Sequence, residues 1–415
     1  MRSVCDRSLR VLLVAVLSGV LAVTALPAAA QDGAGDTSSE SCSNRRLPPP
    51  PVDTSEQPPP GVASPEPLPV PQEPVGGERM GECGLVLPQG APAPPEGLTA
   101  GSWMVQDLDS GAVLAAKNPH GRYRPASLVK ILLALVTIQE FEPDDIITPT
   151  ELDANQECTC VGIVAGGQYK VDDMLHGLLL RSGNDVAHAF ATALGGMPVA
   201  LGKMNELAAR IGATDTRAAS ASGLDGPGMM TSAYDMSLVY NYAMHEPEFA
   251  SAVATQHIDF PGWGGAPDIP IYNDNRLLDD YPGFLGGKTG FTDDARHTYA
   301  GGAERDGRRI GVVLLRGEQR PTRLSAQAAE LLDYGFELAA TGPEPVGQLH
   351  FSPDKLTVPE ETEQQDQDQV AEAGTAILPS DKDPFGVTGW IITLIAAIVS
   401  IGGVIFVHRR RQAEQ

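Results

Sequence analysis

The sequence predicts a mixed α/β (α+β) domain, in which an antiparallel sheet is formed by both ends of the domain and a helical region is inserted between them. Strand patterns bounded by turn dipeptides occur near residue 102 and return near residue 297. Between them the chain shows a series of long helical patterns. Strands at both ends with helices between them indicate one sheet made from the two ends of the domain.

The folded domain is predicted to span residues 98–342. It opens with a β-hairpin, since SWMVQDLD and AVLAAKN flank a turn at Ser110-Gly111. A second hairpin is predicted near its end, where HTYAGGAE and RIGVVLLRG flank Asp306-Gly307. The amphipathic segment RLSAQAAELLDYGFEL closes the domain as a helix. The inserted helical patterns cover residues 127–141, 171–180, 185–196, 198–212 and 233–245.

Both ends of the chain carry membrane-targeting patterns. Residues 1–30 have an arginine-bearing start, an apolar middle and a small-residue ending, which predicts a signal peptide cleaved after Ala30 rather than a retained anchor. Residues 387–407 contain no charged residue and, at about 1.5 Å per residue, predict a transmembrane helix about 30 Å long. The basic tail, residues 408–415, is expected to be cytoplasmic. The domain is therefore expected outside the cell, in a single-pass membrane protein.

Two acidic linkers are predicted to flank the domain. Residues 31–97 are rich in proline, a composition that favours extended polyproline II and forms no core, so a semi-rigid spacer is expected rather than an SH3-type ligand. Residues 343–386 form the second linker. Segments 31–74 and 351–385 together carry 16 acidic and four basic side chains, which is half of the net charge of −24. Since no folded segment presents a basic patch, nucleic-acid binding is not expected.

Four cysteines remain after signal cleavage, and an even number outside the cell predicts disulfides. Of the three possible connectivities, we favour Cys42 with Cys83 and Cys158 with Cys160. A zinc site is the alternative. It is weakly supported, because the sequence contains neither a Cys-x-x-Cys pair nor a His-Glu-x-x-His motif. No metal site is therefore predicted.

A serine and a lysine stand three residues apart where a polar segment enters an apolar one, in RPASLVKILLALV. Ser127 follows an alanine and a proline, so it is a natural helix start. Positions i and i+3 share one helical face, which places the amine of Lys130 within reach of the Ser127 hydroxyl. A serine alcohol needs a base beside it, and lysine can be that base when desolvation and a second cation lower its pKa. By itself the pair supports catalysis only weakly, since Ser-x-x-Lys also arises by chance.

Two motifs further along the chain carry groups that such a pair needs. Ser182 and Asn184 lie on a tight turn between helical patterns, where the serine can pass a proton and the amide can orient the lysine or a substrate carbonyl. FLGGKTGFTDDA then contains Lys288, Thr289 and Gly290 at the approach to a strand. The lysine would supply a second cation, the threonine a hydroxyl for a carboxylate, and the glycine room for close approach. Taken singly, each motif has an ordinary alternative. Residues 182–184 would form a plain interhelical turn, and Lys288 would be a solvated lysine on a surface turn.

Ser-x-x-Lys, Ser-x-Asn and Lys-Thr-Gly, in this order and spacing, resemble the signature set of penicillin-binding proteins and serine β-lactamases. The Ser-Gly-Asn form of the middle motif, and blocks such as SGLDGPGMMTSAYDMSLV, are similar to the D-alanyl-D-alanine carboxypeptidases of peptidase family S11, in particular to actinobacterial members. The likeness covers roughly residues 102–336. It implies a β-lactamase/transpeptidase-like fold and a serine peptidase that trims the terminal D-alanine from peptidoglycan stem pentapeptides. It also implies inhibition by β-lactams and no metal or organic cofactor.

The resemblance assigns catalytic roles to the first two motifs. Ser127 matches the acylated nucleophile, and Lys130 matches its base. Ser182 and Asn184 match the pair that relays a proton and orients the reacting groups.

The third motif is implied to bind the substrate. Lys288 and Thr289 match the groups that hold the terminal carboxylate, and Gly290 belongs to the same strand edge. The oxyanion hole would be formed by the backbone N–H groups of Ser127 and Phe291, each commonly worth about 3 kcal/mol of transition-state stabilisation.

The sequence departs from the family pattern at one point, and two alternative functions remain open. Many relatives have Ala-Gly after the third motif, whereas this chain has Ala295-Arg296, which puts the local backbone and substrate preference in question. A serine β-lactamase is the first alternative, but no Glu-x-x-Leu-Asn segment lies between Ser182 and Lys288. A catalytically silent wall-binding protein on the same fold is the second, and the three intact motifs argue against it.

Overall fold

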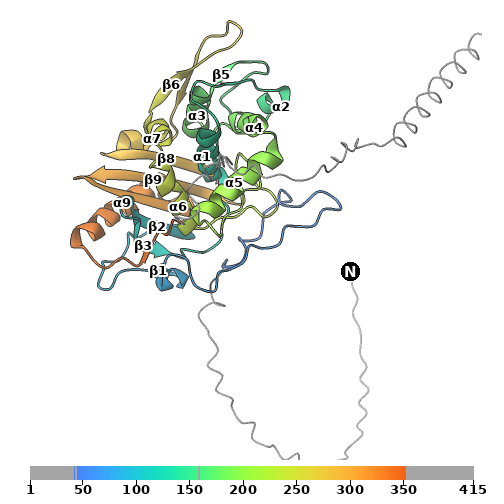
Figure 1. The fold of residues 1–415 in the computed structure, drawn as a ribbon. Coiled ribbons are helices and arrows are strands. Elements are labelled where there is room, and N and C mark those ends of the chain that lie inside the picture. Colours follow the sequence, from blue (N-terminus) through green and yellow to red (C-terminus); the bar gives the residue numbers. More distant parts are fainter. Residues whose placement is uncertain (1–41, 43, 158, 352–415) are drawn as a thin grey trace, which may run out of the picture. The chain divides into compact units, whose positions relative to one another are not determined.

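The computed structural model describes residues 42, 44–157 and 159–351, and Figure 1 shows their fold. The predicted signal peptide, transmembrane helix and basic tail lie outside the described residues, as does most of the second linker. Within the described ranges, no helix has the length and apolar character that a membrane span requires. The membrane topology therefore stays a prediction.

The main sheet is antiparallel and combines both ends of the domain. Its strand order is β1-β3-β2-β10-β9-β8, and β11 also pairs with β3. The two ends meet where β2 pairs with β10, with Val105 opposite Val312. This topology confirms the predicted fold class. The strands are β1 (Leu85–Val86), β2 (Ser102–Asp107), β3 (Ala112–Lys117), β8 (Phe284–Thr292), β9 (Arg296–Arg305), β10 (Arg308–Gly317) and β11 (Gly347–Gln348).

The region inserted between β3 and β8 is mainly helical, as predicted. Two small two-stranded sheets, β4 with β5 and β6 with β7, interrupt it, and neither was predicted because short, largely exposed strands carry little periodic signal. Their strands are β4 (Ile146–Ile147), β5 (Tyr169–Lys170), β6 (His257–Phe260) and β7 (Ile269–Tyr272). The helices are η2 (Ala126–Val129), α1 (Lys130–Glu140), α2 (Glu151–Ala154), α3 (Val171–Leu180), α4 (Asn184–Ala193), α5 (Met197–Ile211), α6 (Ala233–Ala243), α7 (Pro247–Ala254) and α8 (Leu277–Asp280).

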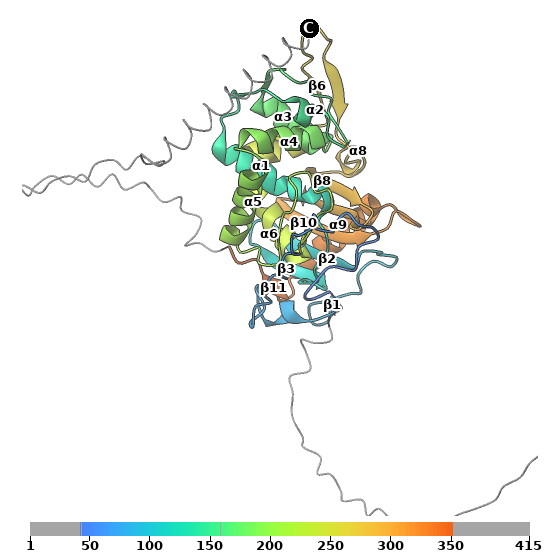
Figure 2. The ribbon, with the colours of Figure 1, turned by 90° about the vertical axis from the view of Figure 1, so that its right-hand side faces the viewer.

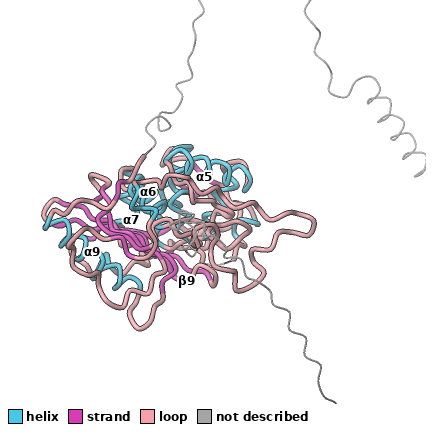
Figure 3. The backbone as a smooth tube through the Cα atoms, turned by 90° about the horizontal axis from the view of Figure 1, so that it is seen from below, coloured by secondary structure: helices cyan, strands magenta, loops and turns pink. Residues whose placement is uncertain are grey.

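Helices cover both faces of the main sheet. Successive residues of a strand point to opposite faces, so Met104 joins the core with α1 and α6, while Trp103 and Val105 join a second core with α9 (Leu324–Thr341). In Figure 3 the magenta strands lie between α6 and α7 on one side and α9 on the other. Figure 2 shows α1 among α3, α4 and α5, above β2, β3 and β10 of the main sheet. The first residues of α1 therefore lie between the sheet and the inserted helices.

The described part of the proline-rich segment corrects the prediction of a spacer. We call residues 44–97 the N-terminal strap, because they lie against the domain. The guanidinium of Arg122 is fully buried and donates to the backbone carbonyls of Arg46, Leu68 and Pro69. A polyproline II chain forms no internal hydrogen bonds, so its carbonyls are open to such a donor. The strap also contains η1 (Glu78–Gly81) and the sheet strand β1, so it is part of the folded domain.

The predicted end of the domain at residue 342 is also too early. Strand β11 lies beyond it and pairs with β3. The hydroxyl of Tyr234 donates to the carbonyl of Gln348 at 2.9 Å, and Leu349 is buried. The folded domain therefore continues at least to the last described residue, Phe351.

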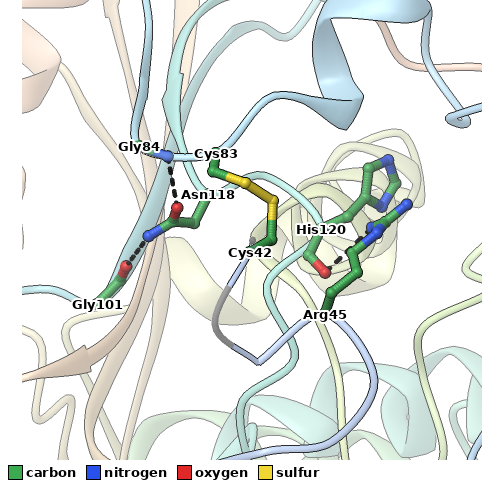
Figure 4. Close-up of a disulfide and its surroundings, with 7 residues drawn as sticks. All are labelled: Cys42, Arg45, Cys83, Gly84, Gly101, Asn118 and His120. Carbon is green, nitrogen blue, oxygen red and sulfur yellow. Dashed lines mark hydrogen bonds between the residues drawn. A yellow bond between two sulfur atoms is a disulfide. The ribbon is translucent and has the colours of Figure 1, made fainter. Parts of the chain in front are cut away.

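A disulfide joins Cys42, just before the strap, to Cys83 within the strap, as Figure 4 shows. It links Cys42 and Cys83 and confirms that predicted pair. Beside it, Asn118 accepts a hydrogen bond from the N–H of Gly84 and donates to the carbonyl of Gly101. The disulfide thus closes the N-terminal segment on itself, and Asn118 ties Gly84 of the strap to the rest of the domain. The second predicted pair includes residue 158, which lies outside the described residues.

Candidate active site

Ser127 lines a cleft of about 350 Å³ at the point where the central helix begins. It lies in η2, which continues directly into α1. The preceding residue, Ala126, has a φ of 49°, in the left-handed region that residues with a Cβ atom seldom adopt. Such a conformation persists only where the surrounding structure enforces it, and it is common beside functional groups.

The amine of Lys130 meets Ser127, as the three-residue spacing predicts. Its Nζ lies 3.0 Å from Oγ of Ser127, and it donates to Oδ1 of Asn184 at 2.8 Å and to the carbonyl of Ser222. When the amine is neutral and donates its two N–H groups to Asn184 and Ser222, its lone pair is free to accept the proton of Ser127. Complete burial lowers the pKa of Lys130 well below its ordinary value of 10.5, and the charge of Lys288 lowers it further. Lys130 therefore has the contacts and environment of a general base.

The turn between α3 and α4 brings Ser182 and Asn184 to the same region. The amide of Asn184 is oriented from behind, since its Nδ2 donates to the carbonyl of Glu157 at 2.7 Å and its Oδ1 then faces Lys130. Ser182 has a φ of 61° and lines the cleft. Within the described residues its hydroxyl has no hydrogen-bond partner, so the structure places it at the cleft without connecting it to the lysine.

Lys288 and Thr289 lie on the edge strand β8. The amine of Lys288 is buried and donates to the backbone carbonyl of Thr289 at 2.9 Å. Burial lowers the pKa of Lys288, and the negative charge of Asp274 partly opposes this shift. The hydroxyl of Thr289 lines the cleft and donates to the Asp274 carboxylate at 2.8 Å. The third motif thus places a buried lysine and a hydroxyl side by side at the edge of the cleft.

Gly290 allows β8 to approach the nucleophile closely. A Cβ atom at this position would lie 2.9 Å from the backbone N of Ser127 and 2.4 Å from Oγ1 of Thr298. Thr298 also donates to the carbonyl of Pro125 at 2.9 Å, which ties β9 to the segment before the nucleophile. A backbone N–H at the nucleophile next to an edge strand is the geometry that a two-donor oxyanion hole requires.

Phe291, the next residue of β8, forms one wall of the cleft. The residue is 47% exposed, and its ring packs against that of His297 at a tilt of 36°, with ring centroids 4.5 Å apart. The guanidinium of Arg296 lies 5.7 Å from the centre of the Phe291 ring. Arg296 is the departure from the family pattern. It has a φ of 57° and pairs with Glu318 through two 3.0 Å hydrogen bonds. The unusual residue therefore stabilises the β8–β9 turn and the aromatic wall.

Several cleft residues were missed by the sequence analysis. The carbonyl of Ser222 bonds Lys130, yet any residue type offers the same carbonyl. Asp274, Arg276 and Arg323 also line the cleft and belong to no motif. A guanidinium recognises a carboxylate well, so both arginines are candidates for binding the charged end of a substrate.

Two groups of side chains in the described residues have the composition of a metal site, but an arginine supplies positive charge to each. Arg122 pairs with Asp215 at 2.8 Å, and Arg124 pairs with Glu56. Neither group lines the cleft. We assign no catalytic role to them. The groups are His120 with Asp215 and Asp235, and Glu56 with Asp225 and Asp294.

A buried amine that can deprotonate a serine, beside a strand edge that can hold a carboxylate, defines a serine acyl-transfer enzyme of the penicillin-recognising type. Residues 89–319 match the family model described as D-alanyl-D-alanine carboxypeptidase, peptidase S11. The chain belongs to this family, and it is a serine-type peptidase.

Known relatives agree with this assignment. The chain is 43% identical over 258 residues to D-alanyl-D-alanine carboxypeptidase DacB2 of Mycobacterium tuberculosis, a match that covers 61% of this chain and 87% of the relative. It is 32% identical over 265 residues to the carboxypeptidase DacD of Salmonella typhimurium, covering 60% and 66%.

Solved structures show the same fold. A crystal structure of D-alanyl-D-alanine carboxypeptidase from Mycobacterium tuberculosis aligns with a TM-score of 0.61 at 42% identity, covering 64% of this chain and all of that chain. A Streptomyces DD-transpeptidase aligns with a TM-score of 0.56 at 24% identity, covering 59% of this chain and all of that one, and so shows the fold alone.

Proposed function

We propose that this protein removes the terminal D-alanine from peptidoglycan stem pentapeptides through an acyl-enzyme on Ser127, and that β-lactams acylate the same serine. The observation that carries the proposal is the contact of the buried Lys130 amine with Ser127, at 3.0 Å. The same cleft is lined by Thr289 of the third motif, next to Lys288. A base at the nucleophile and a cationic strand edge are the two requirements for cleaving a peptide bond next to a free carboxylate.

In the acylation step, neutral Lys130 takes the proton of Ser127 while Oγ attacks the carbonyl carbon of the penultimate D-alanine. The negative charge that develops on the carbonyl oxygen is stabilised by the N–H groups of Ser127 and Phe291. When the tetrahedral intermediate collapses, the C–N bond breaks and D-alanine leaves with the proton. Ser182, which lines the cleft, relays this proton from the lysine to the leaving nitrogen.

In the deacylation step, Lys130 acts on water in place of the serine. The amine accepts a proton from the water molecule, whose oxygen attacks the ester carbonyl. The ester bond to Oγ breaks, and Ser127 recovers its proton from Lys130. A β-lactam supplies a strained amide to the same nucleophile, and hydrolysis of that ester determines how long the adduct persists.

The experiment that tests this function uses the full chain in detergent, with a penicillin and with a peptide that ends in D-Ala-D-Ala. We expect a persistent penicillin adduct by intact-mass spectrometry and release of free D-alanine, both absent in Ser127→Ala. Rapid turnover of penicillin without D-alanine release would instead indicate a serine β-lactamase. Neither adduct nor D-alanine release would indicate a silent wall-binding protein.

We also propose that a single C-terminal helix anchors the protein in the cell membrane, with the catalytic domain facing the cell wall. The apolar segment 387–407 and the basic residues after it support this topology. The Cys42–Cys83 disulfide supports an oxidising compartment outside the cytoplasm. Deleting residues 387–415 is expected to move the protein from the membrane fraction to the medium. A truncated protein that stays with membranes would contradict the anchor.

A further inference from the structure

The part of the cleft beside Thr289 is not uniformly positive. Among the described residues that line the cleft, Asp274 is the one acidic side chain, and two arginines, Arg276 and Arg323, line the same cleft. Neither guanidinium is paired with a described carboxylate within 4.0 Å, so both can act on a ligand. Asp274 is exposed and lies between β7 and α8. A negative charge therefore faces the place where the proposed function puts the carboxylate of the substrate.

The hydroxyl of Thr289 has one proton to donate, and two acceptors need it. In the structure it donates that proton to Oδ2 of Asp274 at 2.8 Å. Under the proposed function, the same hydroxyl donates to the terminal carboxylate of the substrate. It cannot donate to both at once. The incoming carboxylate must replace Asp274 as the acceptor, and it then lies beside a like charge.

Hydrogen bonds hold the backbone around Asp274 in place. Its N–H donates to the carbonyl of Leu180 at 3.1 Å, at the end of α3. The next residue, Asn275, is buried and accepts a hydrogen bond from the hydroxyl of Tyr299 at 2.9 Å. These contacts hold the backbone of residue 274 beside Thr289, so the carboxylate remains within reach of that hydroxyl.

We propose that Asp274 is a specificity-determining residue: in the free enzyme it occupies the hydroxyl of Thr289, and it competes with the terminal carboxylate of the substrate for that hydroxyl. The inference rests on the proposed carboxypeptidase function. Asp274 makes no described contact with the nucleophile or its base, and its charge only opposes the lowering of the pKa of Lys130 by burial and by Lys288. The competition at Thr289 therefore falls on binding, and kinetics are compared at a pH where Lys130 is neutral in both proteins. The competition disfavours ligands with a free carboxylate and leaves neutral ligands unaffected.

Asp274→Asn tests the proposal, because the amide keeps an acceptor for Thr289 and removes the charge. For a peptide ending in D-Ala-D-Ala we expect KM to fall about fivefold, with kcat within about twofold of wild type. Acylation by benzylpenicillin, which carries a carboxylate, should accelerate by a similar factor. For the same peptide ending in D-alanine amide, the variant and the wild type should have the same KM. All measurements use the full chain in detergent.

Asp280→Asn is the matched control, since Asp280 is an exposed acid on α8 that does not line the cleft. It should leave both KM values unchanged, and thermal melting should show that both variants fold. An unchanged or higher KM of Asp274→Asn for the carboxylate peptide would overturn the inference, as would an equal fall for the amide peptide. A wild-type enzyme that releases no D-alanine would overturn the proposed function itself.

Discussion

Lys130→Met is expected to slow acylation of Ser127 by penicillin by about 1,000-fold, within the range that loss of a general base produces. Methionine has similar length and suits the buried site, but it cannot accept the serine proton. The lone pair that faces Oγ at 3.0 Å is lost, and so are the donors to Asn184 and Ser222. The second-order acylation rate of a fluorescent penicillin measures the effect.

Lys203→Met is the control for this substitution. Lys203 is a partly exposed lysine that pairs with Glu140, outside the cleft. In the Lys203→Met variant, penicillin should acylate Ser127 at the wild-type rate. A rate for Lys130→Met within tenfold of wild type, in a variant with an unchanged Tm, would show that another group deprotonates the serine.

The same lysine predicts the pH dependence of acylation. Burial and the charge of Lys288 disfavour the ammonium form of Lys130, so its pKa is lowered and the amine becomes neutral at a lower pH than an ordinary lysine. The acylation rate should rise with pH as this proton leaves, and it should level off well below pH 10.5. Lys288→Gln removes the like charge and should move this limb to higher pH. A limb that stays in place would contradict the role of Lys288.

Asp215→Ala is expected to lower the free energy of unfolding by about 3–5 kcal/mol, because it leaves the buried guanidinium of Arg122 without a counter-charge. The side chains of Arg122 and Asp215 are 0% and 1% exposed, and their nearest atoms are 2.8 Å apart. The same aspartate contacts the ring of His120 at 2.7 Å. For a domain of this size the Tm should fall by roughly 10 °C, which circular dichroism can measure.

An exposed ion pair provides the comparison for this variant. Asp144 pairs with Lys170 at 2.7 Å, but their side chains are 87% and 55% exposed. Asp144→Ala should leave the Tm within about 1 °C of wild type, since solvent screens such pairs. Equal Tm values for Asp215→Ala and Asp144→Ala would show that the buried network does not hold the N-terminal strap on the domain.

The catalytic pair could be predicted because its contact is local. Ser127 and Lys130 are one helical turn apart, so any helix that begins at this proline brings their polar atoms together. Gly290 was also predictable, since a glycine beside a strand signals close backbone approach. The sequence did not reveal that Ser127 itself is the neighbour approached.

Other contacts of the site depend on segments that are distant in the sequence. The carbonyl of Ser222 lies 92 residues from Lys130, and no residue type signals it. Asp274 lies 15 residues from Thr289, beyond a loop and α8 that carry no motif. Their positions follow from how the inserted region returns to β8.

The N-terminal strap shows the same limit on a larger scale. Its composition predicts extended polyproline II without a core of its own, but composition does not say whether its carbonyls face water or protein. That depends on Arg122, which lies 53 to 76 residues away from the carbonyls it bonds. Burial of this arginine makes the strap part of the domain.

By itself, the sequence determined the strand pairs at both ends of the domain, the longer helices between them, the three motifs and, through them, the family. These features are encoded in periodicity and short spacings, which neighbouring residues express without help from the rest of the chain. The tertiary structure alone decided the charge environment of Lys130, the acid at the carboxylate end of the cleft and the docking of the strap. Burial and long-range pairing produce those features, and both depend on distances in space that no local pattern records.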